Sequence, residues 1–296
     1  MIHPTPYGEL NAVLDHLLGG VRAALGDNFV GLYLQGSFAV GDASPGSDCD
    51  FLVVTARDLS PAELAALQTL HKAIHRLPCP HWRNQLEGSY APAAILRRWS
   101  TTPRDPPGEL RPDGWADPGL CGAPPKAYPF WYLDHGSDTL VRSEHDNTQV
   151  VRWCLREKGV TVAGPDIREL VDPVTPDMLR TEVRATMDLG LAVDLQPMEM
   201  IAWQMFWVGL YARMLHTRVT GAVHSKKESL AWAAETLEPE WRGLLLRARA
   251  RTKGDPDAAD PADPEEVAAT RAFAHHVVRL ADTRFAPASD GGPGGD

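Results

Sequence analysis

Cysteine is scarce in this chain of 296 residues. The four cysteines are Cys49, Cys79, Cys121 and Cys154, and none forms a C-x-x-C pair. Scattered cysteines in a chain of this size indicate reduced thiols and not a disulfide framework. The pair Cys79-x-His81 lacks the further ligands that a structural zinc site needs. The sequence therefore disfavours both a disulfide-stabilised secreted protein and a zinc module.

Long apolar runs and an excess of positive charge are also missing. No apolar run approaches the ~18 residues of a membrane span, and the N-terminus lacks the basic-then-apolar order of a signal peptide. We therefore expect a cytoplasmic protein with no membrane partner. The formal net charge of −10 disfavours a nucleic-acid polymer as partner, because phosphate backbones need a positive surface. The same charge suits a small polycationic ligand.

The residues that are present describe a globular protein with room for two domains. Hydrophobic residues make up 44% and charged residues 23% of the chain, which is typical of globular composition. Apolar residues at three- and four-residue spacing predict a helix over 9–25, and a capping box at its start predicts another over 61–76. Strands are predicted over 30–34, 48–54 and 84–90. This order predicts a small sheet covered by helices.

The second half of the chain is predicted to be helical, so the expected fold class is α+β: a small mixed sheet with helices, followed by an α-helical bundle. Between the two parts, a Pro-rich excursion over 100–130 is predicted to be irregular. The expected domains are 1–150, 151–285 and a disordered tail over 286–296. The helices expected in the second domain cover 178–191, 197–217, 230–237, 241–250 and 264–283.

The stretch 30–55 carries the strongest chemical signal. Gly36 and Ser37 end the first strand, where a glycine lets the backbone approach a ligand and free amides and a hydroxyl suit phosphate. Asp48 and Asp50 are two residues apart, so in a strand they project to the same face. Two such carboxylates repel unless a cation lies between them, and Mg²⁺ with phosphate oxygens fits. This combination points to phosphoryl or nucleotidyl transfer.

Glu87 is the next acid, on the next predicted strand. If that strand lies beside the second one, Glu87 comes close to Asp48 and Asp50. It could then bind the metal or remove a proton from an attacking hydroxyl. The alternative is a solvated residue at the edge of the sheet.

The pattern G-S followed by D-x-D resembles the signature of the nucleotidyltransferase superfamily. Gly41 and Ser47-Asp48 also fit its fuller form, GS-x-x-x-G…SD-x-D. The glycines and serines lie in the predicted turn and the acids at the start of the following strand. A signature of this kind gains weight from that context, since short motifs alone have many false matches.

A second resemblance lies in the predicted helical part. The segments LYARML (210–215), TGAVHSKK (220–227) and AWA (231–233) are similar to the helical domain of the streptomycin/spectinomycin adenylyltransferases. The region from Arg156-Glu157 to Asp172-Pro173-Val174 is similar to the link between the two domains of that family. Together with the signature, the resemblance covers most of 30–250.

The resemblance implies a set of site residues. Gly36, Ser37 and Ser47 would hold nucleotide, and Arg213 and Lys226 would reach the phosphates, in keeping with the affinity of Arg and Lys for phosphate oxygens. Asp48, Asp50 and Glu87 would be catalytic and would hold the metal, with Glu87 as general base. Asp146 lies in the region where the family contacts nucleotide. The acceptor region carries Glu199 and Trp203, although the spacing there departs from the family pattern.

The implied activity is Mg²⁺-dependent transfer of AMP from ATP to a hydroxyl of a small cationic acceptor, most simply an aminoglycoside. Such an enzyme would act as a monomer and confer antibiotic resistance. Two alternatives remain open at this point: a nucleotidyltransferase acting on another metabolite or on a protein hydroxyl, and a catalytically silent nucleotide-binding regulator. The retention of all three acids favours chemistry over the silent alternative.

Overall fold

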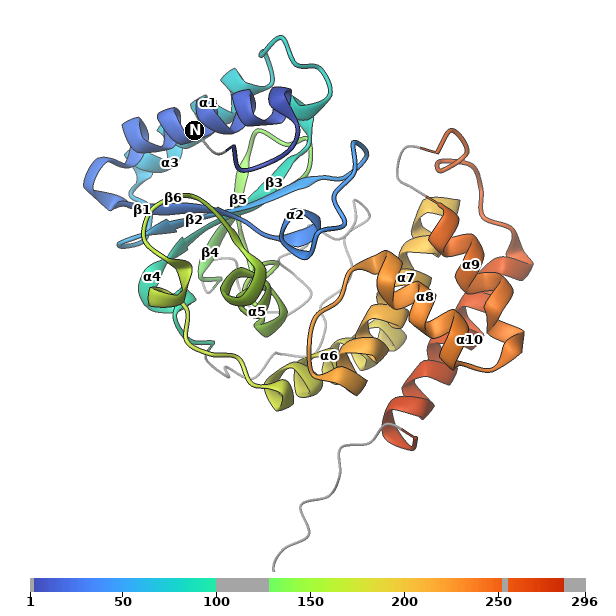
Figure 1. Ribbon diagram of the computed structural model, residues 1–296. Coiled ribbons are helices and arrows are strands. Elements are labelled where there is room, and N and C mark those ends of the chain that lie inside the picture. Colours follow the sequence, from blue (N-terminus) through green and yellow to red (C-terminus); the bar gives the residue numbers. More distant parts are fainter. Residues whose placement is uncertain (1–2, 100–127, 252–254, 285–296) are drawn as a thin grey trace, which may run out of the picture. The chain divides into compact units, whose positions relative to one another are not determined.

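The computed structural model describes residues 3–99, 128–251 and 255–284 (Figure 1). The chain forms two compact units, Met1–Thr175 and Pro176–Asp296. The sequence suggested a division near 150, but the segment up to 175 belongs to the first unit because its strand joins the sheet. Most of the Pro-rich excursion, Cys121 and the tail over 286–296 lie outside the described residues.

The first unit is built on a six-stranded sheet with the order β5-β4-β3-β2-β1-β6. Strands β2 and β3 are parallel, and the other neighbouring pairs are antiparallel. The three predicted strands are confirmed, whereas the three short strands of four residues each were not predicted. The strands are β1 (Phe29–Leu34), β2 (Cys49–Thr55), β3 (Leu86–Pro92), β4 (Phe130–Leu133), β5 (Leu140–Ser143) and β6 (Val160–Ala163).

Helices cover both faces of this sheet. Helices α1 and α3 lie together on one face (Figure 1), where Leu14 and Leu67 pack with Phe51 of β2. On the opposite face, Leu155 of α5 packs with Tyr33 of β1. The helices of this unit are α1 (Gly8–Leu25), α2 (Gly36–Val40), α3 (Pro61–Ile74), α4 (Ala93–Leu96) and α5 (Gln149–Lys158), with 3-10 turns at Gly26–Asn28, Trp82–Asn84 and Ile167–Glu169.

The alternation of side chains along each strand decides which polar groups reach the face that carries α5, called the α5 face below. In β2, Phe51 packs toward α1 and α3, so Asp50 points to the α5 face. In β3, Leu86 and Tyr90 pack toward α1 and α3, so Glu87 also points to the α5 face. The alternation of side chains along the two strands thus brings the predicted acids to one face of the sheet.

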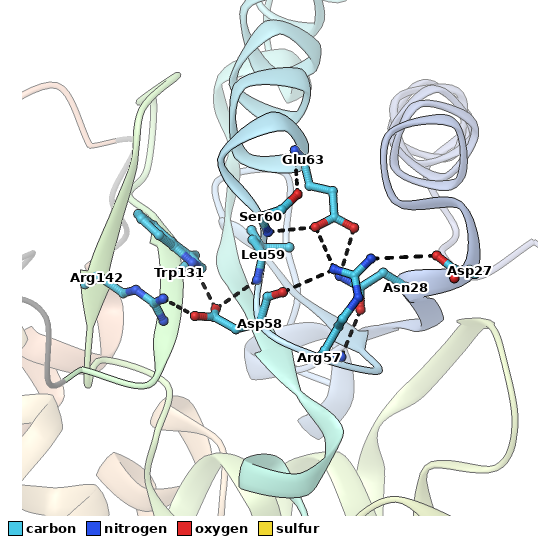
Figure 2. A network of polar contacts seen from close by, with 9 residues as sticks. All are labelled: Asp27, Asn28, Arg57, Asp58, Leu59, Ser60, Glu63, Trp131 and Arg142. Carbon is cyan, nitrogen blue, oxygen red and sulfur yellow. Dashed lines mark hydrogen bonds and ion pairs between the residues drawn. The ribbon is translucent and has the colours of Figure 1, made fainter.

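A polar network fixes the start of α3 (Figure 2). Ser60 and Glu63 form the predicted capping box, with Glu63 Oε2 accepting from Ser60 N at 2.7 Å. Glu63 also accepts from Arg57 Nη1 at 2.9 Å and from Asn28 Nδ2 at 3.1 Å. The hydrogen bond from Arg57 is the main reason that the pKa of Glu63 falls to about 2, and burial opposes this shift. The network therefore joins α3 to the start of β1.

Asp58 extends the network toward the edge of the sheet formed by β4 and β5 (Figure 2). Its carboxylate accepts from Trp131 Nε1 of β4 at 3.2 Å and is paired with Arg142 of β5. The Arg142 guanidinium also lies 4.3 Å from the Trp131 ring centroid, a cation–π arrangement. These contacts anchor the outer strands β4 and β5 to the loop between β2 and α3.

The second unit is helical, as predicted. Its large apolar side chains form a bundle core, with Trp207, Tyr211 and Phe273 at most 1% exposed. Within the described residues, no helix combines the length and apolarity needed to cross a bilayer. Its helices are α6 (Pro176–Ala192), α7 (Ile201–Thr220), α8 (Lys226–Thr236), α9 (Arg242–Ala250) and α10 (Pro264–Asp282), with a 3-10 turn at Pro239–Trp241.

Candidate functional site

The parallel pairing of β2 and β3 brings the predicted acids together. Asp50 is the register partner of Glu87, and Asp48 immediately precedes β2. One carboxylate oxygen of Asp48 and one of Glu87 lie within 4.8 Å of each other. Their side chains are 11% and 16% exposed, so both are largely shielded while still open to a ligand.

Asp50 packs directly against the turn after β1. Gly36 has φ +55°, and a Cβ built there would lie 1.8 Å from Asp50 Oδ2. Only glycine therefore fits this position, both for its backbone angle and for the space that the carboxylate occupies. The structure thus places the predicted Gly-Ser turn in contact with the second aspartate.

The two predicted serines of this region differ in their surroundings. Ser37 Oγ is buried and has no hydrogen-bond partner within the part of the chain that is described, so it is a donor available to a ligand. Ser47 Oγ accepts from Ser44 N at 3.0 Å and lies 3.3 Å from Ser44 Oγ, which closes the loop ahead of Asp48. Ser37 is suited to hold a phosphate oxygen, and Ser47 shapes the approach to Asp48.

Glu87 is held by two side chains for which the sequence indicated no contact with this acid. Tyr132 OH donates to Glu87 Oε1 at 2.7 Å, and His145 Nε2 lies 3.3 Å from the same oxygen. The Tyr132 and His145 rings are stacked with centroids 4.4 Å apart. Burial acts to raise the pKa of Glu87, but the His145 and Tyr132 contacts outweigh it and lower that pKa. Glu87 is therefore a fixed, ionised carboxylate at neutral pH.

His145 is a cation at neutral pH in this setting. Burial acts against its charged form, yet the hydrogen bond to Glu87 and the charges of Asp146, Glu87 and Asp50 raise the pKa of His145 to about 9. Burial is the largest single effect on this pKa, and the neighbouring carboxylates outweigh it together. The imidazolium partly balances the negative charge of the acids around it.

Asp146 lies beneath this group and is only 4% exposed. Its Oδ1 accepts from Gln35 Nε2 at 3.0 Å, and its Oδ2 accepts from Ser89 Oγ at 2.6 Å. Burial is the main reason that the pKa of Asp146 is raised, although these contacts oppose the shift. Asp146 thus ties the end of β1 to β3, and a nucleotide contact through its carboxylate stays a prediction.

The group that best fits a divalent cation includes a histidine. Asp48, Glu87 and His135 each offer one ligand atom, and these atoms lie within 4.8 Å of one another. His135 Nδ1 lies 3.1 Å from Asp48 Oδ1. Two carboxylates and an imidazole at this spacing are a donor set that a divalent cation can use. Asp50, predicted as the third ligand, is not in this group, and its metal role stays a prediction.

The sequence could not place Tyr132, His135 or His145 beside Glu87. They follow the Pro-rich excursion and have no fixed spacing to the signature. The pairing of β4 with β3 brings Tyr132 and His135 near Glu87, and the segment after β5 brings His145 there. The alternation of side chains along β4 explains the direction of Tyr132. Phe130 packs on the α5 face, and Tyr132, two residues later, points to the same face.

The remaining predicted residues lie in the second unit. Arg213 is half-buried in α7, and Lys226 begins α8 with its Cε 2.5 Å from where a Cβ on Gly209 would lie. Trp203 is half-buried and packs edge-to-face on Phe206 with centroids 5.8 Å apart. Glu199 is exposed. The predicted roles of Arg213, Lys226, Glu199 and Trp203 in ligand binding stay predictions.

Comparison with known proteins finds a family match in each unit. The family model described as Nucleotidyltransferase domain matches residues 20–81, and the one described as Aminoglycoside adenylyltransferase, C-terminal domain matches residues 169–279. No curated protein matches the chain in sequence.

Among solved structures, the chain is similar to a spectinomycin adenyltransferase from Enterococcus faecialis, crystallised with ATP and spectinomycin. The TM-score is 0.63 at 17% sequence identity, and the match covers 90% of this chain and 98% of the other. At this identity the likeness establishes the shared fold. The two family matches show an enzyme with a nucleotidyltransferase domain, followed by a domain similar to the C-terminal domain of the aminoglycoside adenylyltransferases.

Proposed function

We propose that this enzyme transfers AMP from Mg²⁺-bound ATP to a hydroxyl of a small cationic acceptor of the aminoglycoside class. The observation that carries the proposal is the convergence of Asp48, Asp50 and Glu87 on the α5 face, next to the Gly36–Ser37 turn. Because the solved relative was crystallised with ATP and spectinomycin, spectinomycin is the first acceptor to test. A net charge of −10 suits a cationic acceptor.

In this proposal, the turn after β1 binds the triphosphate. The backbone at Gly36 admits close approach, and the buried Ser37 hydroxyl donates to a phosphate oxygen. Arg213 and Lys226 bind phosphate oxygens and neutralise the pyrophosphate that leaves. Asp146 accepts from Gln35 and Ser89, which fixes the ends of β1 and β3, and a contact of its carboxylate with the nucleotide remains part of the proposal.

Glu87 is the proposed general base. The acceptor hydroxyl oxygen attacks the α-phosphorus of ATP, its proton passes to the carboxylate, and the bond to pyrophosphate breaks. Tyr132 and His145 both contact Oε1, so they orient Glu87 and hold it in its ionised form. A divalent cation bound at Asp48 and its neighbouring acids would offset the negative charge of the triphosphate. Glu199 and Trp203 are proposed to contact the acceptor.

The test combines pyrophosphate release with mass spectrometry of the acceptor. The purified chain is incubated with Mg-ATP and one acceptor at a time: spectinomycin, streptomycin or a further aminoglycoside. Addition of one AMP to an acceptor, lost in Asp50→Asn, supports the proposal. Normal ATP binding without AMP transfer to any of these acceptors would reject an aminoglycoside substrate, and full activity of Asp50→Asn would reject the role of the aspartate pair.

A further inference from the structure

His135 owes its position to an anchored turn at the end of β4. Leu133 is the register partner of Gly88, so the chain that continues past Leu133 runs toward the level of Glu87 in the neighbouring antiparallel strand. Asp134 Oδ1 accepts from His135 N at 2.8 Å, and the Tyr132 hydroxyl oxygen lies 3.3 Å from the same carboxylate oxygen. The turn therefore has contacts of its own that hold His135 near the acids.

A second set of contacts fixes the far side of the same turn. Ser137 N donates to Asp134 O at 2.9 Å, which closes the turn. His75 Nε2 of the α3 C-terminus lies 2.9 Å from Ser137 O. The turn is thus fastened to α3 as well as to β3, and the position of His135 is set by the fold and not by a long, unsupported loop.

From this geometry we infer that His135 is a nitrogen ligand of the divalent cation, and that it makes the site favour a first-row transition metal such as Mn²⁺ over Mg²⁺. The inference rests on the proposed function only in expecting a divalent cation at these acids. Its support is the placement of one His135 ring nitrogen within 4.8 Å of ligand oxygens of both Asp48 and Glu87. Imidazole is a common ligand of first-row transition metals, whereas Mg²⁺ is held mainly by oxygen and water.

A simple ion pair between His135 and Asp48 is the competing explanation, since the two lie 3.1 Å apart. An ion pair accounts for two of the three side chains. It does not explain the short range between the carboxylates of Glu87 and Asp48, whose repulsion the His145 contact with Glu87 offsets only in part. A cation shared by all three side chains accounts for the whole group.

The test measures metal binding by the full-length chain without nucleotide. The chain is stripped with EDTA, dialysed, and titrated with Mn²⁺ alone, with free Mn²⁺ followed by electron paramagnetic resonance. Spin-echo modulation from ¹⁴N then reports whether a histidine nitrogen is bound to Mn²⁺, and Mg²⁺ is added as the competitor. The variants are His135→Ala, His135→Asp and, as a matched control, His16→Ala, which alters an exposed histidine of α1 in the same unit.

The wild type is expected to show nitrogen modulation and tighter binding of Mn²⁺ than of Mg²⁺. His135→Ala should lose the modulation and weaken Mn²⁺ binding at least about tenfold, because even outer-sphere partners of a metal contribute that much. His135→Asp should recover Mn²⁺ binding without nitrogen modulation and with a smaller preference over Mg²⁺. His16→Ala should match the wild type.

Two results would overturn the inference: nitrogen modulation that survives in His135→Ala, or Mn²⁺ affinity in His135→Ala equal to that of His16→Ala. Thermal unfolding of each variant separates loss of a ligand from loss of folding. The binding test needs no turnover, so it fails separately from the proposed function. Absence of AMP transfer with nitrogen modulation present would reject the function alone, and AMP transfer with no effect of His135 on metal binding would reject this inference alone.

Discussion

Gly36 offers the sharpest test of how the site is built, through the substitution Gly36→Ala. The added Cβ would lie 1.8 Å from Asp50 Oδ2, whereas ordinary contact begins at 3.4 Å, so the carboxylate must retreat by about 1.6 Å. A misplacement of ~1 Å in a catalytic group can cost about 100-fold in rate. We therefore expect AMP transfer to fall by about two orders of magnitude or more.

Gly26→Ala is the matched control for this substitution. Gly26 has φ +53°, close to the +55° of Gly36, but a Cβ there would meet nothing within 4 Å. Its ψ of −117° also disfavours alanine, so alanine is strained at this position as well. Both variants should lose ~1–3 kcal/mol of unfolding free energy from that strain, which corresponds to a few °C per kcal/mol in Tm for a unit of this size.

The two measurements are a melting curve and the rate of AMP transfer, made on the same preparations. The reasoning requires that both variants are destabilised and that only Gly36→Ala loses activity out of proportion to its stability. It would be refuted if Gly36→Ala kept the rate of Gly26→Ala, because the contact with Asp50 would then have no bearing on the chemistry.

Three further predictions concern a proposed base, a structural acid and a proposed phosphate ligand. Glu87→Gln should lower the rate of AMP transfer at least 100-fold, as expected for loss of a general base, with ATP binding retained in a binding titration. Glu63→Gln should lower the free energy of unfolding by ~1 kcal/mol at neutral pH, because the charge-assisted bond to Arg57 is lost while glutamine can still complete the capping box. The pKa of Glu63 is about 2 in the folded protein, below the ~4.3 of the unfolded chain. The stability that Glu63 contributes is therefore complete above pH ~4.3 and is lost as the pH falls toward 2. Denaturant unfolding should show a smaller difference in unfolding free energy between wild type and Glu63→Gln at pH 3 than at pH 7, and an equal difference would contradict this. Lys226→Ala should raise the KM for ATP, measured by pyrophosphate release, while the exposed Lys227→Ala does not.

The sequence predicted the parts of the site that are local in the chain. Gly36, Ser37 and the Asp48–Asp50 pair lie within one strand-turn-strand segment, so their spacing alone carries the chemistry. Glu87 was also reachable, because the next strand along the chain is the parallel neighbour of β2. The expected α+β fold followed from the change of apolar period between the two halves of the chain.

The rest depended on pairing that no local pattern encodes. Strands β4, β5 and β6 have four residues each, which is too short for a period of two to stand out. His135 reaches Glu87 because β4 pairs with β3 in one register, and His145 reaches it from the segment that follows β5. The boundary near 150 moved to 175 for the same reason: β6 adds to the edge of the sheet beside β1.

The buried Asp146 has a consequence for cooperativity. Its two acceptor bonds join Gln35, 111 positions earlier in the chain, and Ser89, 57 positions earlier. A carboxylate sealed from water keeps both donors only while β1, β3 and the start of α5 are all in place. Partial opening of the first unit would leave this buried acid without its donors. We therefore expect denaturant to abolish turnover and sheet structure together, with no active intermediate at any denaturant concentration.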